Sequence, residues 1–263
     1  MFSVSWPRID LHTHICMTSL DEMLASAAKH DIREFGISEH IFQLHEGQTI
    51  FPYFADEGPR ISRDWYVASV RDAAERGRMK VRLGLEVDFV PGTEGEVGAL
   101  LQEVDWDYLI GSVHEIGGWD LFTETPADEE EGFRLWDRYY SLISEAIESG
   151  LFDIISHPLR NALLNTHIPA HLDDLLESVA SVAAANDVAL ELNGEDITLW
   201  PDLIERLARA CARTGCLVSL GSDAHGPENV ARGLQRATEI ATVAGVRGCV
   251  SFDDRERRFF SLD

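Results

Sequence analysis

The chain has 263 residues, 45% of them hydrophobic, and a formal net charge of -24 at pH 7. This composition supports a folded core rather than an intrinsically disordered chain, and the length suits one large α/β domain. So negative a surface repels nucleic-acid phosphates and anionic lipid, and no run of Lys and Arg offsets it. Nucleic acid and membranes are therefore not expected partners.

The sequence carries no signal for secretion or for insertion into a membrane. Residues 1–7 lack a basic and apolar leader, and no apolar run reaches the length that spans a bilayer. Cys16, Cys211, Cys216 and Cys249 are sparse and form no Cys-x-x-Cys pair, which indicates reduced thiols. We expect a cytoplasmic protein.

Short apolar or β-branched runs alternate along the chain with segments of helical period. The predicted strands are residues 4–11, 34–38, 81–89, 108–113, 152–156, 188–192 and 216–220. The predicted helices are residues 19–30, 62–76, 94–103, 129–148, 172–186, 201–213 and 228–244. Strands and helices that alternate in this way form parallel sheets with right-handed crossovers.

Seven strand–helix units predict a closed barrel of the TIM type that is one strand short of eight. An open, doubly wound sheet is the alternative, although no Gly-rich fingerprint follows the first strand. We find no linker and no repeat, so one domain is expected over residues 1–263. The segment 41–61 is long for a barrel loop, and loops of that length often form lids or contact substrates.

Ionisable side chains collect at the carboxyl ends of the predicted strands. His12 and His14 alternate at the end of the first strand, so both point to the same side. Later strands add further residues of the same kinds: His40, Glu86, His114, His157, Asp223 and His225. Since the carboxyl ends of parallel barrel strands share one face, these side chains are expected to surround a single space.

A lone histidine at a strand end is most often an ordinary polar residue, and His30, His45, His167 and His171 in helices or loops keep that interpretation. Chance does not readily place a histidine at strand end after strand end. Imidazoles and carboxylates without a thiolate suit Zn²⁺, Mn²⁺ or Fe²⁺, and so many ligands indicate two or three ions. Such ions favour attack on phosphorus but also serve amide hydrolysis, so the metals alone leave the reaction open.

Taken in order, the motifs resemble those of a known family. The matching stretches are Asp10-Leu-His-Thr-His14, Gly36-Ile-Ser-Glu-His40, Gly84-Leu-Glu86, Gly111-Ser-Val-His114, Ser156-His-Pro158, Glu191-Leu-Asn193 and Gly221-Ser-Asp-Ala-His225. They are similar to the successive motifs of the PHP (polymerase and histidinol phosphatase) family and cover nearly the whole chain. Residues 84–92 and 107–119 look most like the histidinol-phosphate phosphatase branch. This resemblance implies a distorted (β/α)7 barrel, a trinuclear site and removal of phosphate from L-histidinol phosphate.

By position, the resemblance also implies the metal ligands: His12, His14, His40, Glu86, His114, His157, Asp223 and His225. Glu86 would bridge the ion of the His12 and His14 pair to a second ion. His40 and His225 would hold a third. The catalytic group would be a metal-bound hydroxide rather than a protein nucleophile, held by Glu86, His114, His157 and Asp223.

The sequence departs from this branch after the first motif. Histidinol phosphatases usually carry a further ligand in a longer loop, but here residues 15–18 lead straight into the next helix. Ser19-Leu-Asp-Glu22 fits a capping box, in which the Ser and Glu side chains each satisfy a backbone N–H group. Asp21 could replace the missing ligand, although the capping box favours a helix first-turn residue. A weak or absent third ion is expected.

A second departure concerns the substrate phosphate. The segment 194–200, where that branch tends to offer basic residues, contains none here. We therefore consider Arg160, Arg60 and Arg63 as phosphate-binding residues, each with the alternative of an ordinary surface arginine. Arg160 is preferred because it follows His157 closely on the predicted active face.

Rival functions remain at this stage. Many metal-dependent amidohydrolases open with the same His-x-His and bridge two ions through a carboxylated lysine at a strand end. The two lysines here, Lys29 in a predicted helix and Lys80 at a strand start, cannot do this. Histidinol phosphate is the leading substrate, while other small phosphomonoesters and cyclic-nucleotide or sugar phosphodiesters stay open. The sequence does not determine the metal or the oligomeric state.

Overall fold

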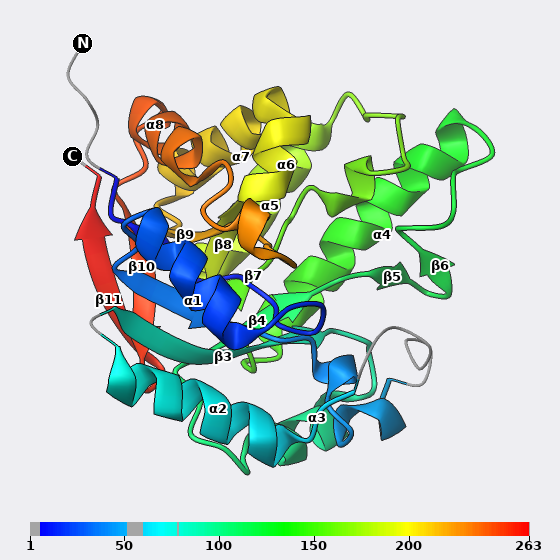
Figure 1. The fold of residues 1–263 in the computed structure, drawn as a ribbon. Helices are drawn as coiled ribbons and strands as arrows, with labels where there is room; N and C mark the ends of the chain where they lie inside the picture. Colours follow the sequence, from blue (N-terminus) through cyan, green and yellow to red (C-terminus); the bar gives the residue numbers. More distant parts are fainter. Residues whose placement is uncertain (1–5, 52–59, 78, 263) are drawn as a thin grey trace.

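The computed structural model describes residues 6–51, 60–77 and 79–262. In it, helices surround a parallel sheet (Figure 1). Seven parallel strands neighbour one another in chain order: β1 Ile9–Asp10, β2 Glu34–Ile37, β3 Lys80–Asp88, β4 Tyr108–Ser112, β7 Ile154–Ile155, β8 Ala189–Asn193 and β9 Val218–Gly221. These are the predicted strands, although β1 is shorter than expected and residues 4 and 5 of that prediction lie outside the described part.

Backbone hydrogen bonds just beyond the strand ends join β1 to β9. The N–H of Leu11 donates to the carbonyl of Leu220 at 2.9 Å, and the N–H of Asp223 donates to the carbonyl of His12 at 2.8 Å. Thr13 and Ala224 form a further parallel bridge. The sheet therefore closes on itself at its carboxyl end, as the distorted (β/α)7 barrel predicts and an open sheet does not.

Each predicted helix is present. Their bounds are α1 Leu20–Lys29, α2 Arg63–Arg76, α3 Glu94–Leu101, α4 Glu129–Glu148, α5 Leu172–Ala185, α7 Pro201–Thr214 and α8 Leu234–Ala244. The capping box at α1 is confirmed, because Ser19 Oγ accepts the N–H of Glu22 and the Glu22 carboxylate accepts the N–H of Ser19. The predicted start of α8 at Glu228 is wrong by six residues, since Ala231 and Gly233 have φ of 63° and 72° and interrupt the helix.

Other elements were not predicted from the sequence. They are the hairpin of β5 Glu115–Ile116 and β6 Trp119–Asp120, the short helix α6 Gly194–Leu199, and the hairpin of β10 Gly248–Asp253 and β11 Glu256–Ser261. β10 continues the sheet in parallel beside β9, through Cys249 and Val218. In Figure 1 this red and orange hairpin lies beside the blue N-terminal segment. β11 is largely exposed and rich in arginine. Its sequence therefore lacks the apolar alternation by which a half-buried strand is predicted.

A tyrosine fills the barrel below the carboxyl ends of the strands. Tyr108 is fully buried, and its hydroxyl donates to the carbonyl of Leu11. A Cβ atom on Gly36 would lie 2.0 Å from Tyr108 Oη, and one on Gly84 would lie 2.3 Å from its ring Cζ. Only glycine fits at these two positions. The ring closes the floor beneath the polar side chains of the next layer.

The segment predicted as a lid begins with two 3₁₀ turns, Ile41–Gln43 and Gly47–Thr49. Residues 52–59 of that segment lie outside the described part, so its role stays a prediction. Among the helices that the structure describes, none is long and apolar enough to cross a membrane.

Candidate metal centre

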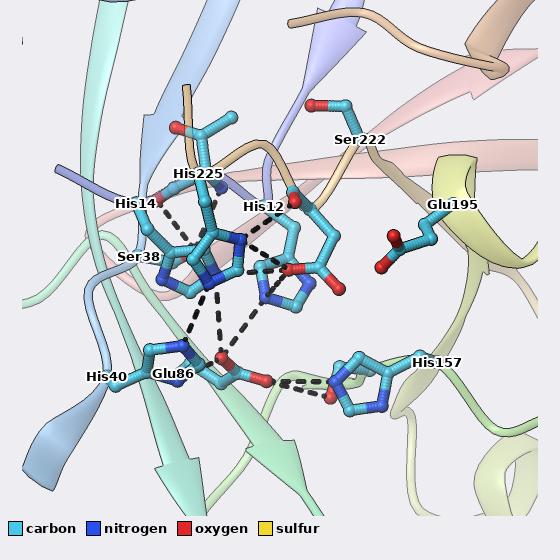
Figure 2. Close-up of polar contacts among 12 residues, drawn as sticks. His12, His14, Ser38, His40, Glu86, His157, Glu195, Ser222 and His225 are labelled. Carbon is cyan, nitrogen blue, oxygen red and sulfur yellow. Dashed lines mark hydrogen bonds and ion pairs between the residues drawn. The ribbon is translucent and has the colours of Figure 1, made fainter. Parts of the chain in front are cut away.

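Above Tyr108, imidazoles and carboxylates from all around the barrel point toward one another (Figure 2). Most are fully buried, and His40 and His225 at the rim are partly exposed. Ring contacts and ion pairs connect the predicted ligands into one cluster: His12, His14, His40, Glu86, His114, His157, Asp223 and His225. The structure therefore brings all eight predicted side chains together.

Glu86 lies at the middle of the cluster, and its two oxygens face different groups of histidines. Oε1 is 3.1 Å from His157 Nε2 and 3.6 Å from His114 Nε2. Oε2 is 3.3 Å from His12 Nε2 and 2.7 Å from His40 Nδ1. Glu86 is fully buried in β3, so neither oxygen meets solvent. A carboxylate divided in this way has the geometry of a bridge between two cations.

The spacing of the imidazole nitrogens fits bound metal ions. His114 Nε2 and His157 Nε2 are 3.3 Å apart, and so are His40 Nε2 and His225 Nε2. Two nitrogens that bind one Zn²⁺ tetrahedrally at about 2.0 Å are separated by about 3.3 Å. His12 Nε2 and Glu86 Oε2 are buried without a hydrogen bond, although such groups are normally satisfied. The donor set of imidazole and carboxylate suits Zn²⁺, Mn²⁺ or Fe²⁺.

Three groups of side chains in the described part of the chain have ligand atoms close enough to share an ion. They are His12, His14 and Asp223; His12, Glu86 and His157; and His14, His40 and His225. The first group contains three of the four ligands expected for the first ion. The second joins Glu86 and His157, both expected at the second ion, to His12 and lacks His114. The third adds His14 to the expected His40 and His225, and its three rings stack, with His14 centroids 4.1 and 4.2 Å from the other two.

Two further carboxylates orient these histidines. Glu191 Oε1 is 2.9 Å from His12 Nδ1, and Asp88 Oδ1 is 2.6 Å from His114 Nδ1. A carboxylate on Nδ1 fixes the tautomer that leaves Nε2 free to bind a metal. Both acids lie inside the motifs read from the sequence, but neither was assigned a role. The available signal was their spacing, since Asp88 lies two residues from Glu86 on the same strand face.

Glu39 performs a similar task at the other edge of the cluster. Its carboxylate accepts the N–H groups of Ile15 and His40 at 2.9 Å each, and lies 3.5 Å from His14 Nδ1. Burial raises the pKa of Glu39, but the hydrogen bond and charge of His14 outweigh it and lower the pKa to about 2. Burial likewise lowers the pKa of His14, yet bonds to Asp223 and Glu39 raise it to about 9.

The buried carboxylates of Glu86 and Asp223 stay ionised only with positive charge nearby. Burial raises the pKa of Glu86, but the charges of His12 and His40 outweigh it and hold the pKa well below its usual range. The pKa of Asp223 is held low against burial by His12, His14 and Arg160. Without metal, protonated imidazoles would supply that charge, and divalent ions would replace those protons, because metal binding releases protons from its ligands.

Two of the ligands lie at backbone positions with unusual φ angles, which nearby carboxylates hold in place. His157 and Asp223 have φ of 27° and 56°, in the region that side chains other than glycine rarely adopt. Glu191 Oε2 accepts the N–H of His157 at 2.8 Å, and Asp10 accepts the N–H groups of Ser222 and Ala231. Strained positions of this kind persist only where the surroundings over-determine them, and they cluster at functional sites.

Of the three arginines considered for phosphate, only Arg160 reaches the cluster. Its Nη2 is 2.8 Å from Asp223 Oδ2, and its Nη1 is 2.8 Å from Glu195 Oε2. Arg60 instead donates to Gln48, and Arg63 pairs with Glu103 outside the cavity. Their positions give no support to the prediction that they bind substrate.

The remaining candidates lie away from the cluster. Asp21 is exposed in the first turn of α1 and belongs to none of the three ligand groups found in the described residues. His171 pairs with Asp137 at 2.7 Å on the surface. These positions agree with the interpretation of Asp21 as a helix first-turn residue.

A cavity of about 350 Å³ opens over the cluster. Its lining combines metal-site residues with two aromatic rings and a further acid: His40, Phe42, His114, Phe122, His157, Arg160, Glu195, Asp223 and His225. Phe42 stacks on His40 with ring centroids 4.6 Å apart, and Phe122 lies 5.4 Å from His114. The opening has the size of a small-molecule site.

Comparisons with known proteins agree with this geometry. The family model for the PHP domain matches residues 9–195. This chain belongs to the PHP domain family. A relative from Deinococcus radiodurans, named "Probable histidinol-phosphatase", is 38% identical over 210 residues, which are 73% of this chain and 75% of the relative. A Shewanella halifaxensis relative named "Probable phosphatase" is 25% identical over 228 residues, 82% of this chain and 77% of the relative.

The fold has a close match among solved structures. Histidinol phosphate phosphatase from Lactococcus lactis, in complex with zinc, L-histidinol and phosphate, superposes with a TM-score of 0.81. The match covers 97% of this chain and 100% of that one at 18% identity, which supports the distorted TIM-like barrel. By family and relatives, this chain is a metal-dependent phosphoesterase that uses divalent ions. The amidohydrolase alternative is not supported.

Proposed function

We propose that this PHP protein removes phosphate from histidinol phosphate, with the eight clustered side chains as metal ligands. The carrying observation is the position of Glu86, whose two oxygens face separate groups of histidines. When bound there, divalent ions supply activated water at neutral pH and neutralise charge on the phosphate oxygens. The 38% identical relative that is named a histidinol-phosphatase supports the choice of substrate.

The chain's own residues prepare the site for a phosphate. The two oxygens of Asp223 contact different groups: Oδ1 lies 3.2 Å from His14 Nε2, and Oδ2 accepts a hydrogen bond from Arg160. Arg160 therefore holds Asp223 in place on one side and lines the cavity on the other. Its guanidinium offers several donors in one plane, the geometry that binds phosphate oxygens. The phosphate would lie between Arg160 and the histidine cluster.

The cavity also limits the rest of the substrate. The alcohol of the substrate would lie toward the rim and leave past Phe42, Phe122 and Glu195. A volume of about 350 Å³ accommodates a small alcohol and leaves little room for a polymer. The two aromatic rings offer flat apolar contact to a ring such as the imidazole of histidinol.

The test is hydrolysis by the purified protein reconstituted with Zn²⁺, Mn²⁺ or Fe²⁺, measured as phosphate released from monoesters and as monoester formed from diesters. The panel contains histidinol phosphate, other phosphomonoesters, a cyclic nucleotide and a sugar phosphodiester. We expect histidinol phosphate to give the highest kcat/KM. A preference for a diester, or no release from histidinol phosphate with any metal, would contradict the proposal.

A matched pair of variants tests the phosphate site. Arg160→Gln should raise KM for histidinol phosphate by about tenfold or more, because a hydrogen bond to a charged group is lost. Arg63→Gln should change neither kcat nor KM, since Arg63 pairs with Glu103 outside the cavity. Elemental analysis of both variants separates loss of phosphate binding from loss of metal. Equal effects of the two substitutions would refute the role of Arg160.

A further inference from the structure

Glu195 is an acid in the wall of a cavity that receives a phosphate. It lies in the first turn of α6, where its N–H donates to Asn193 Oδ1 at 2.9 Å. Its side chain is 34% exposed, whereas that of Asp223, the other acid of the lining, is 6% exposed. Figure 2 shows its carboxylate directed toward the cluster from the side opposite His14 and His40. Glu195 is therefore the acid of this wall that a substrate can reach.

The contacts of Glu195 place it in competition with the phosphate. Oε2 binds Arg160 Nη1 at 2.8 Å, and Oε1 is 3.4 Å from Arg232 Nη2. Arg160 thus shares its charge among Asp223, Glu195 and the buried Asp196, whose Oδ1 lies 3.3 Å from Nη2. A carboxylate beside a dianionic phosphate repels it, and this repulsion is removed when a cation lies between them. An acid in this position therefore favours substrates that bring their own positive charge.

The remaining wall is compatible with such a group. Phe122 is 44% exposed and lines the same cavity as Glu195. An ammonium group near an aromatic face and a carboxylate gains from both, through cation–π attraction and an ion pair. The histidines and Asp223 of the lining belong to the metal cluster, and Arg160 is assigned to the phosphate. Glu195 is therefore the remaining charged residue of the lining for the leaving group.

We propose that Glu195 is a specificity-determining residue that selects phosphomonoesters whose alcohol carries a cationic nitrogen and disfavours those that carry a second anion. This inference rests on the proposed phosphatase function but covers a class wider than histidinol phosphate. Any amino-alcohol phosphate that fits the cavity belongs to the class.

The test uses three substrates of similar size that differ in charge: phosphoethanolamine, propyl phosphate and phosphoglycolate. The wild-type protein should show kcat/KM in that order. In Glu195→Gln, the ratio between the cationic and the neutral substrate should fall by about fivefold, the upper range for a partly exposed ion pair. The kcat/KM for phosphoglycolate should rise, because Arg160 and Arg232 are released. Glu205→Gln, on the surface of α7, is the matched control and should leave all three unchanged.

Binding provides a second readout that does not need turnover. Calorimetry with 3-aminopropylphosphonate and butylphosphonate should show a Kd ratio that Glu195→Gln reduces by the same factor. A variant that changes all substrates equally would show that Glu195 only positions Arg160, and would overturn the inference. If the wild type hydrolyses the substrates without regard to charge, the inference fails while the phosphatase function stands. If no phosphomonoester is hydrolysed, the proposed function itself fails.

Discussion

Both ends of the barrel bury charged side chains, but they satisfy them differently. At the amino end, Glu34 is 4% exposed and accepts from Lys80 Nζ at 2.9 Å and from Ser251 Oγ at 2.6 Å. Arg82 pairs with Asp253 at 2.6 Å beside it. Here the cations are side chains of the protein, and they attach the C-terminal hairpin to the barrel.

At the carboxyl end, Glu86 faces imidazoles, and Asp223 faces imidazoles on one side and Arg160 on the other. Nitrogen atoms approach one another at 3.3 Å, and His12 Nε2 and Glu86 Oε2 make no hydrogen bond. Buried carboxylates are stable only with positive charge beside them, and neutral imidazoles do not supply it, so this end depends on ions from outside. The amino end is thus complete as folded, and the carboxyl end becomes complete on binding metal. The following changes test that difference, from the largest expected effect to the smallest.

Glu86→Ala should remove the bridge between the two groups of histidines. We expect two ions to be lost rather than one, and activity to fall to the background of the assay, because the two Glu86 oxygens face Nε2 atoms of both groups. Elemental analysis of the purified variant measures this directly. Full metal content would contradict the bridging role.

Glu34→Gln applies the same kind of change to the amino end. The change weakens the hydrogen bonds that the buried Glu34 carboxylate accepts from Lys80 and Ser251, so the free energy of unfolding should fall by about 2 kcal/mol. Metal content and kcat per folded molecule should stay as in the wild type, since Glu34 lies below the Tyr108 floor. Urea denaturation measures the loss. A decrease in bound metal would show that the two ends are coupled.

Glu191→Gln tests how far the metal site depends on residues that do not bind metal. The amide cannot accept both from His12 Nδ1 and from the N–H of His157 as the carboxylate does. Metal affinity should fall about 10- to 100-fold, as is usual when a partner of a ligand is changed. Competition with a chromogenic chelator gives the dissociation constants. Unchanged affinity would mean that His12 is oriented by packing alone.

Asp21→Asn should have the smallest effect, a loss of about 0.5 kcal/mol from the first turn of α1, with activity retained. The ion beside His14, His40 and His225 should be the first lost on dialysis, because that group consists of imidazoles alone. Metal counting before and after dialysis checks both points. A variant that lost activity together with one ion would show that Asp21 is a ligand.

Much of the site could be predicted from local sequence. His12 and His14 are two residues apart, so in a strand both point to the same side. The other histidines lie at strand ends, and parallel barrel strands bring their carboxyl ends to one face. Hydrophobic periodicity predicted the strands and helices. The order of the motifs along the chain then indicated one family. The capping box at Ser19 was equally local.

Tertiary structure decided the rest. Several features of the site join segments that are far apart in the chain. They are the closure between β1 and β9, the contacts of the two Glu86 oxygens with different histidines, and the carboxylates that hold Nδ1 of His12 and His114. Arginines illustrate the limit. The sequence favoured Arg160 over Arg60 and Arg63 only for its place after His157, and the fold shows that Arg160 lines the cavity while Arg63 pairs with Glu103. A side chain's residue type and period fix the face on which it stands. Its partner depends on distances that no local pattern contains.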